Sequence, residues 1–415
     1  MPPTESRYAV VLGDERVGTL YQRGDFTRFV FLESYLLNPS RAILGLNFEQ
    51  NLTGRHAAAL RLPPWFSNLL PEGVLRDWIA TDRGVSADRE MELLAQVGHD
   101  LPGAVRVLPC EGEEDAFEDP GLSLTGTDKR TVQEDLHLEM RFSLAGVALK
   151  FSMLAEDHRL TLPAFGQGGD WIVKLPDRAY PDVPRNEYAM MSLAAAVGID
   201  VPEVRLYRRD ELDTLPSRVW PGDETLAYAV RRFDRGENRQ PIHIEDLAQV
   251  RGVYPSEKYL GNYETVAALV YRLHDISALQ EFARRLAFTV LISNGDAHLK
   301  NWSLVYRNPV SPTLSPAYDL VCTAAYMGEG ETLGMKFAGS RRFDGVTVGT
   351  FRRLERRLCA EGAGLEDVVV ELVSRVRSVL PMCDELLAEA PQVRQCVASS
   401  VARASRTLLS TTKIA

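Results

Sequence analysis

Apolar positions divide the chain into three stretches with different periodicities. The first stretch contains short runs of β-type residues at Tyr8–Leu12 and Arg28–Leu32, separated by turn signals such as Gly13-Asp14. A helical pattern follows over Trp65–Thr81. This stretch predicts a small α/β module over residues 1–112, which is within the usual size of a domain.

The second stretch, residues 120–255, predicts a sheet with one packed helix. It follows an acidic run, EGEEDAFED at Glu111–Asp119, whose charges repel one another and indicate a boundary or an exposed loop. A helical pattern runs from Pro184 to Val197 and ends at Gly198, because glycine readily takes the backbone conformation that closes a helix. The strand-like segments are Trp171–Lys174, Val204–Tyr207 and Leu226–Val230.

The third stretch, residues 256–415, is mainly helical. Apolar residues recur there at three- and four-residue spacing, as expected for helices with one buried face. The segments are Thr265–Leu273, Leu279–Ile292, Thr350–Cys359, Leu365–Leu380 and Pro391–Leu408. The pattern of the whole chain predicts an α+β protein whose C-terminal part is mostly α.

Composition narrows the classes of function. No run of 18 apolar residues and no secretory signal is evident, so we expect a cytoplasmic protein without a membrane partner. The five cysteines are scattered and never form a C-x-x-C pair, which favours reduced thiols. The formal charge of −10 opposes direct binding to phosphate backbones. We therefore expect contact with DNA only through a basic partner.

The segment LAFTVLISNGDAHLKNWSLVY carries the strongest chemical signal. An apolar helical pattern ends at Asn294-Gly295, and Asp296 is separated from Asn301 by four residues. D-x-x-x-x-N is the spacing of a protein kinase catalytic loop, in which the Asp orients the acceptor hydroxyl and the Asn binds Mg²⁺. We therefore predict Asp296 as the catalytic base and Asn301 as a metal ligand.

A second carboxylate follows in Ala317-Tyr318-Asp319-Leu320, after a turn rich in proline. Kinases hold their main magnesium ion with an Asp in this position, so we predict Asp319 as a metal ligand and Tyr318 as a neighbour of the nucleotide. Alternatively, Asp296 and Asp319 only stabilise turns, as aspartate often does. The match of several parts favours the kinase interpretation.

Upstream, Lys174 lies in the strand-like WIVK and Glu187 lies near the start of the helical segment that follows. A strand lysine facing a helix glutamate is the ion pair that orients ATP phosphates in kinases, and Lys174 is the predicted phosphate ligand. Alternatively, Lys174 is an exposed strand residue and Glu187 is only favoured by the helix dipole in the first turn of its helix, since this arrangement gives the same sequence pattern.

Two further segments are candidates for contact with ATP. We expect Ser143, Ala145 and Gly146 to lie in a loop whose backbone N–H groups meet the phosphates, although Ser-x-x-Gly is common in ordinary turns. Arg231 and Phe233 end a strand where the adenine-binding hinge of a kinase belongs, so we expect backbone groups near these residues to pair with adenine. A surface cluster of salt bridges is an equal explanation for the charges of RRFDR.

Gln249 follows the hinge in IEDLAQ and is a candidate to line the cleft, although an acid-rich helix start explains this segment almost as well. His298 lies inside the catalytic loop, where we expect it to contact phosphate or to brace Asp296. The other six histidines lack the spacing of metal ligands.

These segments resemble a known family, the HipA-type toxin kinases. The motif series SLAGVALK, WIVKLP, NEYAMMSLAAAVGI, RRFDR, IEDLAQ, NGDAHLKN and AYDL occurs in the family's order. WFSNLLPEG and GHDLPGAVRVLP resemble the N-terminal accessory subdomain of these proteins, so the resemblance covers nearly the whole chain.

The resemblance implies a protein-kinase-like two-lobe fold, with a mixed α/β N-lobe, an accessory subdomain and a mainly helical C-lobe. It implies ATP and Mg²⁺ as cofactors and transfer of phosphate to Ser or Thr of a protein. The implied target is a translation component, such as glutamate-tRNA ligase or another aminoacyl-tRNA synthetase, and the implied outcome is growth arrest or persistence.

The family also implies autophosphorylation at Ser143 and a HipB-like helix-turn-helix antitoxin as partner. Two other functions remain open. One is a small-molecule or lipid phosphotransferase, whose catalytic loop has a similar G-D-x-H-x-x-N pattern. The other is a catalytically idle co-repressor that acts with an antitoxin on DNA.

Overall fold

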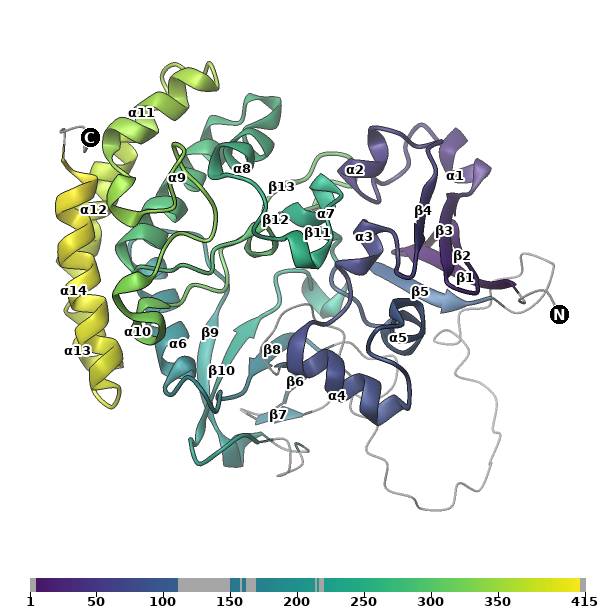
Figure 1. Cartoon of the computed structure of the whole chain (residues 1–415), viewed down its shortest axis with the longest axis horizontal. Helices are drawn as coiled ribbons and strands as arrows, with labels where there is room; N and C mark the ends of the chain where they lie inside the picture. The colour runs from purple at the N-terminus through teal and green to yellow at the C-terminus, as the bar shows by residue number, and fades with distance from the viewer. Residues whose placement is uncertain are drawn as a thin grey trace.

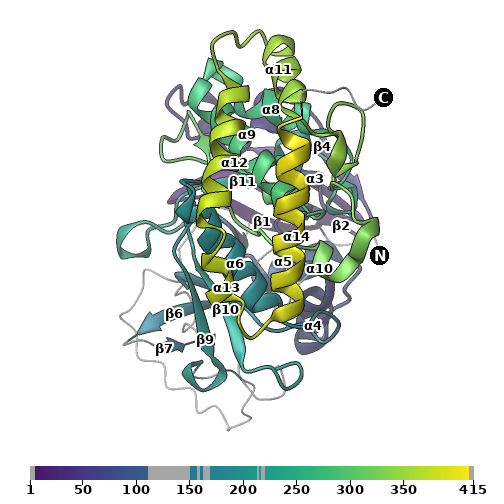
Figure 2. The same cartoon turned by 90° about the vertical axis from the view of Figure 1, so that its left-hand side faces the viewer.

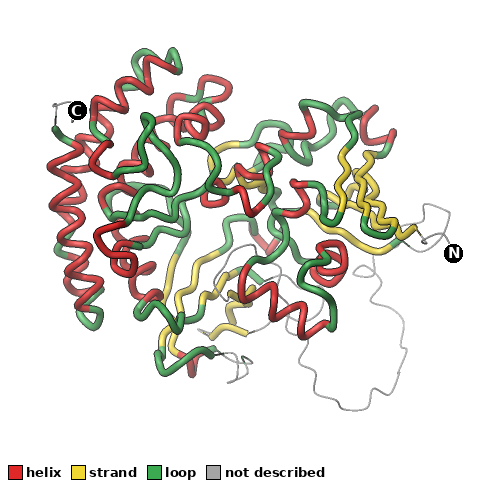
Figure 3. Tube along the Cα trace, in the orientation of Figure 1, coloured by secondary structure: helices red, strands yellow, loops and turns green. Residues whose placement is uncertain are grey.

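The computed structural model describes residues 5–110, 150–156, 159–161, 169–212, 215 and 220–410. The acidic run at Glu111–Asp119 and the candidate phosphate loop with Ser143, Ala145 and Gly146 lie outside these residues. The described chain forms three sheets, with most of the long helices gathered on one side (Figures 1 and 3).

The accessory subdomain is an antiparallel sheet of five strands in the order β4-β3-β2-β1-β5. Its strands are β1 (Glu5–Leu12), β2 (Glu15–Arg23), β3 (Phe26–Phe31), β4 (His56–Ala59) and β5 (Val105–Pro109). Its helices are α1 (Glu33–Leu37), α2 (Leu46–Glu49), α3 (Pro64–Ser67), α4 (Gly73–Arg83) and α5 (Glu90–Val97). Side chains of β3 alternate between exposed and buried, and Phe29 and Phe31 point into an aromatic core with Phe48 and Phe66.

The helical pattern expected over Trp65–Thr81 is divided in the structure. Helix α3 ends at Ser67 and α4 begins at Gly73, with Pro71 between them. Proline has no backbone N–H and disfavours a helical conformation of the residue before it, so a continuous helix is not expected here. The break places Asn68 and Glu72 at the edge of the subdomain that faces the helical lobe.

The N-lobe contains a second antiparallel sheet, in the order β7-β6-β8-β10-β9. Its strands are β6 (Lys150–Glu156), β7 (Arg159–Thr161), β8 (Trp171–Lys174), β9 (Val204–Arg208) and β10 (Leu226–Arg231). Helix α6 (Val183–Ala196) packs against β9 and β10, so the predicted sheet with one packed helix is confirmed.

The C-lobe is helical around a small third sheet, β11-β12-β13, formed by Ile244–Asp246, Ser303–Val305 and Thr313–Leu314. Its helices are α7 (Leu247–Arg251), α8 (Tyr263–Val270), α9 (Ile276–Leu291), α10 (Ala324–Met327), α11 (Val348–Arg357), α12 (Leu365–Val379), α13 (Met382–Leu386) and α14 (Pro391–Leu408). Helices α12 and α14 both pack on α9 and lie side by side on the outer face (Figure 2). Because β11 pairs with β12, Ile244–Arg251 packs with this lobe although it precedes residue 256.

The apolar core shows how the three parts are joined. One buried cluster fills the C-lobe and includes the inner face of α6. A second cluster is shared by the accessory subdomain and the N-lobe sheet, with Val10 and Phe66 on one side and Phe151 and Trp171 on the other. The accessory subdomain therefore packs directly on the N-lobe sheet. Within the described ranges, we find no helix whose length and hydropathy would let it cross a bilayer.

Candidate functional site

The loop that follows α9 brings Asp296 and Asn301 together. Asp296 N–H donates to Asn294 Oδ1 at 3.0 Å, and Asn301 Nδ2 donates to the Asp296 carbonyl at 3.2 Å across a short 3₁₀ turn. Gly295 permits the close approach of this loop to the segment Glu331–Gly334, because a Cβ there would overlap Glu331 Oε1 and would lie 2.6 Å from the carbonyl oxygen of Thr332. The loop is therefore held in a closed shape by its own side chains.

Asp319 lies against this loop, although it is distant in the sequence. Asn301 Nδ2 donates to Asp319 Oδ2 at 3.1 Å. The backbone of Asp319 has a φ of 60°, a left-handed conformation that costs energy in a residue with a side chain and is often found at functional sites. Its side chain is 36% exposed, so one edge of the carboxylate is open to solvent.

Lys174 on β8 joins this carboxylate to α6. Its Nζ donates to Glu187 Oε1 at 2.7 Å and also donates to Asp319 Oδ1. Glu187 is 2% exposed and Lys174 is 15% exposed, so the expected lysine–glutamate ion pair is present and is largely shielded from water. One ammonium group thus lies between two carboxylates.

The charges of this trio are set by burial and by one another. Burial works against the charged form of Asp319, but the attraction of Lys174 outweighs it and holds the pKa of Asp319 well below its usual range. Burial also opposes the charge of Lys174, and Asp319 and Glu187 together raise the lysine pKa. Burial raises the pKa of Glu187, and Lys174 only partly offsets this effect. Asp319 and Lys174 are therefore ionised at neutral pH.

Asp296 has its own partner, which the sequence did not indicate. The hydroxyl of Tyr259 donates to Asp296 Oδ1, and burial raises the pKa of Asp296 despite this hydrogen bond. The Tyr259 ring meets His298 edge to face, with ring centroids 5.0 Å apart. His298 is 6% exposed, and burial lowers its pKa to about 4. It is therefore neutral at pH 7, and its ring packs against the tyrosine whose hydroxyl donates to Asp296.

The oxygen atoms of Asp319 and Asn301 fit a magnesium site. Mg²⁺ prefers carboxylate and amide oxygens and keeps several waters, so two protein ligands with one solvent-facing edge are sufficient. The 3.1 Å contact between the two side chains places both groups at one point. To present its oxygen to a metal, Asn301 would rotate its amide away from that hydrogen bond.

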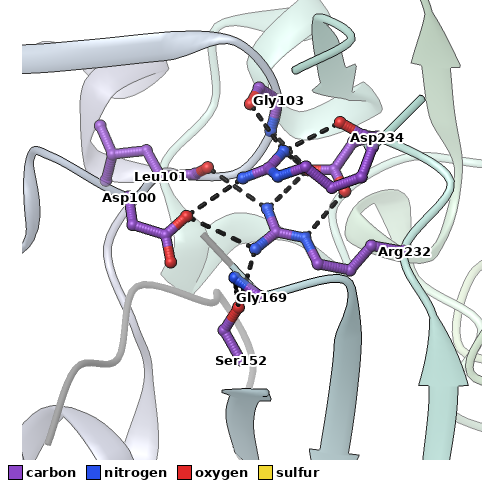
Figure 4. Close-up of polar contacts among 8 residues, drawn as sticks. Asp100, Leu101, Gly103, Ser152, Gly169, Arg232 and Asp234 are labelled. Atoms are coloured by element: carbon purple, nitrogen blue, oxygen red, sulfur yellow. Dashed lines mark hydrogen bonds and ion pairs between the residues drawn. The ribbon is translucent and has the colours of Figure 1, made fainter. Parts of the chain in front are cut away.

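Three of the four charged residues of RRFDR, namely Arg232, Asp234 and Arg235, form a buried network, and Figure 4 shows the contacts around Arg232 and Asp234. The fourth, Arg231, is exposed. Arg232 donates to both carboxylate oxygens of Asp234, at 2.9 and 2.7 Å, and to Ser152 Oγ on β6 at 3.1 Å. Arg235 pairs with Asp100 at 3.1 Å, and Asp234 also accepts from Gly103 N–H at 2.8 Å. The network joins the hinge, the N-lobe sheet and the GHDLPG segment of the accessory subdomain. The salt-bridge interpretation of these charges is thus the one the structure supports, with the cluster buried instead of exposed.

The hinge itself requires one correction. The N–H of Arg231 donates to the Glu203 carbonyl at 2.8 Å, so this group is not available to adenine as expected. Phe233 lies with its ring 5.6 Å from that of Tyr318. The Tyr318 hydroxyl in turn donates to the carbonyl of Lys300 in the catalytic loop, at 2.8 Å. Phe233 and Tyr318 therefore remain the candidates for contact with the adenine ring of ATP.

Gln249 has a different place from the one expected. Its side-chain Oε1 accepts from Asp246 N–H at 2.8 Å, in a capping box at the start of α7. Its Nε2 donates to the Trp65 carbonyl at 3.2 Å, and the residue is 3% exposed. Both polar ends of the side chain are used to join α7 to the accessory subdomain, so we remove Gln249 from the nucleotide site.

Family models and known proteins show what this chain is similar to. Residues 8–108 match the HipA N-terminal domain, and residues 142–380 match the HipA-like C-terminal domain. The chain is 41% identical over 380 residues to "Putative kinase Y4dM" of Sinorhizobium fredii, covering 89% of this chain and 90% of that protein. It is 25% identical over 381 residues to the serine/threonine-protein kinase toxin HipA of Shewanella oneidensis, covering 82% and 81% of the two chains.

The fold has a counterpart among solved structures. A chain of the Shewanella oneidensis HipA, HipB and operator DNA complex superposes with a TM-score of 0.73 at 21% identity, covering 96% of this chain and 97% of that one. This likeness supports the two-lobe arrangement. The chain belongs to the HipA family and has its kinase-like two-lobe fold.

Proposed function

We propose that the protein is a toxin kinase of the HipA type, which transfers the γ-phosphoryl group of ATP to a serine or threonine hydroxyl of a protein. The observation that carries this proposal is the contact of Lys174 with both Glu187 and Asp319, beside Asn301. A phosphate-binding lysine, a buried glutamate that orients it and a metal-binding pair are the parts that phosphoryl transfer requires.

Each residue has a role in this proposal. Lys174 binds ATP phosphate, Asn301 and Asp319 hold Mg²⁺, and Asp296 orients the acceptor hydroxyl and receives its proton. Bound Mg²⁺ would neutralise charge on the phosphates. The raised pKa of Asp296 makes it a better proton acceptor than an exposed aspartate.

Partners and regulation follow from the family. We propose a HipB-like helix-turn-helix antitoxin as partner and contact with DNA only through it, which suits the net charge of −10. The Shewanella HipA, HipB and operator DNA complex supports such an assembly. We propose a translation component, such as glutamate-tRNA ligase, as target and growth arrest or persistence as outcome.

Autophosphorylation at Ser143 is the proposed means of self-inactivation. A phosphate on this serine adds a charge of about −1.5 to −2, which would repel the phosphates of ATP from the loop. Ser143 itself lies outside the described residues.

The experiment incubates the full chain with γ-labelled ATP and Mg²⁺, alone, with purified aminoacyl-tRNA synthetases, and with a panel of small hydroxyl compounds. Label on serine or threonine of a protein, mapped by mass spectrometry, supports the proposal. Label only in small compounds indicates a small-molecule phosphotransferase. ATP binding without transfer to any acceptor indicates an idle co-repressor.

A further inference from the structure

Glu72 of the accessory subdomain reaches into the back of the catalytic loop. It directly precedes α4, and its side chain is 14% exposed. Its Oε2 lies 2.9 Å from Lys258 Nζ, and its Oε1 lies 3.0 Å from Lys300 Nζ. Both lysines belong to the helical lobe and are 8% exposed. One carboxylate therefore pairs with two nearly buried ammonium groups.

Lys300 connects Glu72 to the proposed metal ligand. It directly precedes Asn301, and its Nζ also donates to the carbonyl and to Oδ1 of Asn68, at 3.0 and 3.2 Å. Its own carbonyl accepts from the Tyr318 hydroxyl, one residue before Asp319. The accessory subdomain thus makes the closest contacts of the Lys300 ammonium group, and Asp246 Oδ2 of the helical lobe lies farther away, at 3.7 Å. The backbone of Lys300 is tied to the segment that carries Asp319.

Lys258 connects Glu72 to the proposed catalytic base. The carbonyl of Lys258 accepts from Leu299 N–H in the catalytic loop at 3.1 Å. The next residue, Tyr259, donates its hydroxyl to Asp296. Among the described residues, Tyr259 is the only one whose side chain donates a hydrogen bond to the Asp296 carboxylate. A displacement of Lys258 would therefore also displace this donor.

The negative charge of Glu72 is the feature on which this arrangement depends. Burial favours the neutral acid, but Lys300 and Lys258 outweigh it and lower the pKa of Glu72 to about 2. Glu72 is thus ionised at any physiological pH. If Glu72 were neutral, the ammonium groups of Lys258 and Lys300 would repel each other in a site with little water. Loss of one charge from a buried ion pair strongly destabilises the structure around it, because the remaining charge has no partner.

We propose that Glu72 is a positioning residue for phosphoryl transfer: through Lys300 and Lys258 it fixes Asn301 and Asp296, so the accessory subdomain completes the active site. This inference rests on the proposed kinase function. Loss of supporting contacts of this kind typically lowers activity about 10–100-fold.

The test compares Glu72→Gln and Glu72→Asp with Glu90→Gln in the full chain. Glu90 is a matched control, because it is a buried carboxylate of the same subdomain that accepts from Leu62 N–H and Ser67 Oγ. Its hydrogen bonds and ion pair with the described residues lie within the accessory subdomain and do not include the catalytic loop. Three quantities are measured: kcat, KM for ATP, and hydrogen–deuterium exchange of residues 293–303.

For Glu72→Gln we expect kcat to fall at least about tenfold, KM for ATP to stay within about twofold, and exchange of the loop to rise. Glu72→Asp, which keeps the charge, should recover part of kcat, and Glu90→Gln should leave the loop unchanged. Equal kcat and loop exchange in Glu72→Gln and Glu90→Gln would overturn the inference. If the wild type lacks activity, the proposed function fails, and loop exchange alone still decides whether Glu72 orders the loop.

Discussion

Lys174 and Glu187 form the buried ion pair that links the N-lobe sheet to α6, with 2.7 Å between Nζ and Oε1. The same ammonium group contacts Asp319, so the charge of Lys174 connects its strand both to α6 and to the proposed metal site. We expect Lys174 to exchange Asp319 for ATP phosphate when the nucleotide binds.

The first prediction concerns this pair. Glu187→Gln should lower kcat/KM for ATP by about 10–100-fold, because Lys174 loses the carboxylate that orients it toward phosphate. Steady-state release of ADP measures this effect. Glu371→Gln is the control, since Glu371 pairs with Arg375 on the exposed face of α12 and should leave kcat/KM unchanged. Equal values for both variants would show that the ion pair does not orient Lys174.

The second prediction concerns the approach of the catalytic loop to the segment Glu331–Gly334. Gly295→Ala should reduce phosphoryl transfer at least about tenfold, because a Cβ 2.6 Å from the Thr332 carbonyl forces the residue before Asp296 to move. Gly330→Ala is the matched control, since a Cβ at Gly330 meets no atom within 4 Å. A Gly295→Ala protein with wild-type turnover would mean that the position of the loop backbone does not limit the reaction.

The third prediction concerns the buried network in Figure 4. Asp234→Asn should lower the free energy of unfolding by about 3–5 kcal/mol, because Arg232 and Arg235 keep their charges in a buried site without the carboxylate between them. Urea-induced unfolding measures the loss. Glu371→Gln removes an exposed pair on α12 and should cost less than about 1 kcal/mol. A similar cost for both variants would exclude a structural role for the network.

The fourth prediction concerns acid stability. Burial lowers the pKa of His243 to about 4, and its Nε2 contacts the Leu44 carbonyl at 2.8 Å. Between pH 6.5 and 4 the unfolded chain binds a proton that folded His243 does not, so stability falls as pH decreases, by up to about 3 kcal/mol.

His243→Gln tests this prediction, because glutamine retains a donor near the position of Nε2 but does not titrate. Its stability should decrease less between pH 6.5 and 4.5 than that of the wild type. The comparison with the wild type is necessary, since burial also raises the pKa of Glu245 to about 7, which changes stability in the opposite direction over this range. Parallel pH profiles would show that His243 is not the group responsible.

The sequence predicted the parts of the site that lie close together along the chain. Asp296 and Asn301 are in one loop, and Lys174 and Glu187 are in a strand and the helix that follows it, so their spacing carried the information. The strands and the long helices could be predicted equally well, because burial on one face leaves a periodic pattern of apolar residues in the sequence.

The sequence did not predict contacts between distant segments. Asp100, Arg232 and Arg235 look like ordinary surface charges until the accessory subdomain and the hinge are brought together. The pattern around Gln249 suits either a cleft or a capping box, and only the contact with Trp65 separates the two. Glu72 and Tyr259 carried no signal of their link to the catalytic loop, because their partners are set by tertiary packing.

The central claim is tested most directly by measuring ATP binding and phosphoryl transfer separately in the wild type, Asp296→Asn and Asp319→Asn. Asp296→Asn should bind ATP with Mg²⁺ within about twofold of the wild-type affinity and lose at least about 100-fold in transfer, since it lacks only the proton acceptor. Asp319→Asn should also lose the Mg²⁺ dependence of ATP binding. Undiminished transfer by either variant would contradict the assignment of these carboxylates.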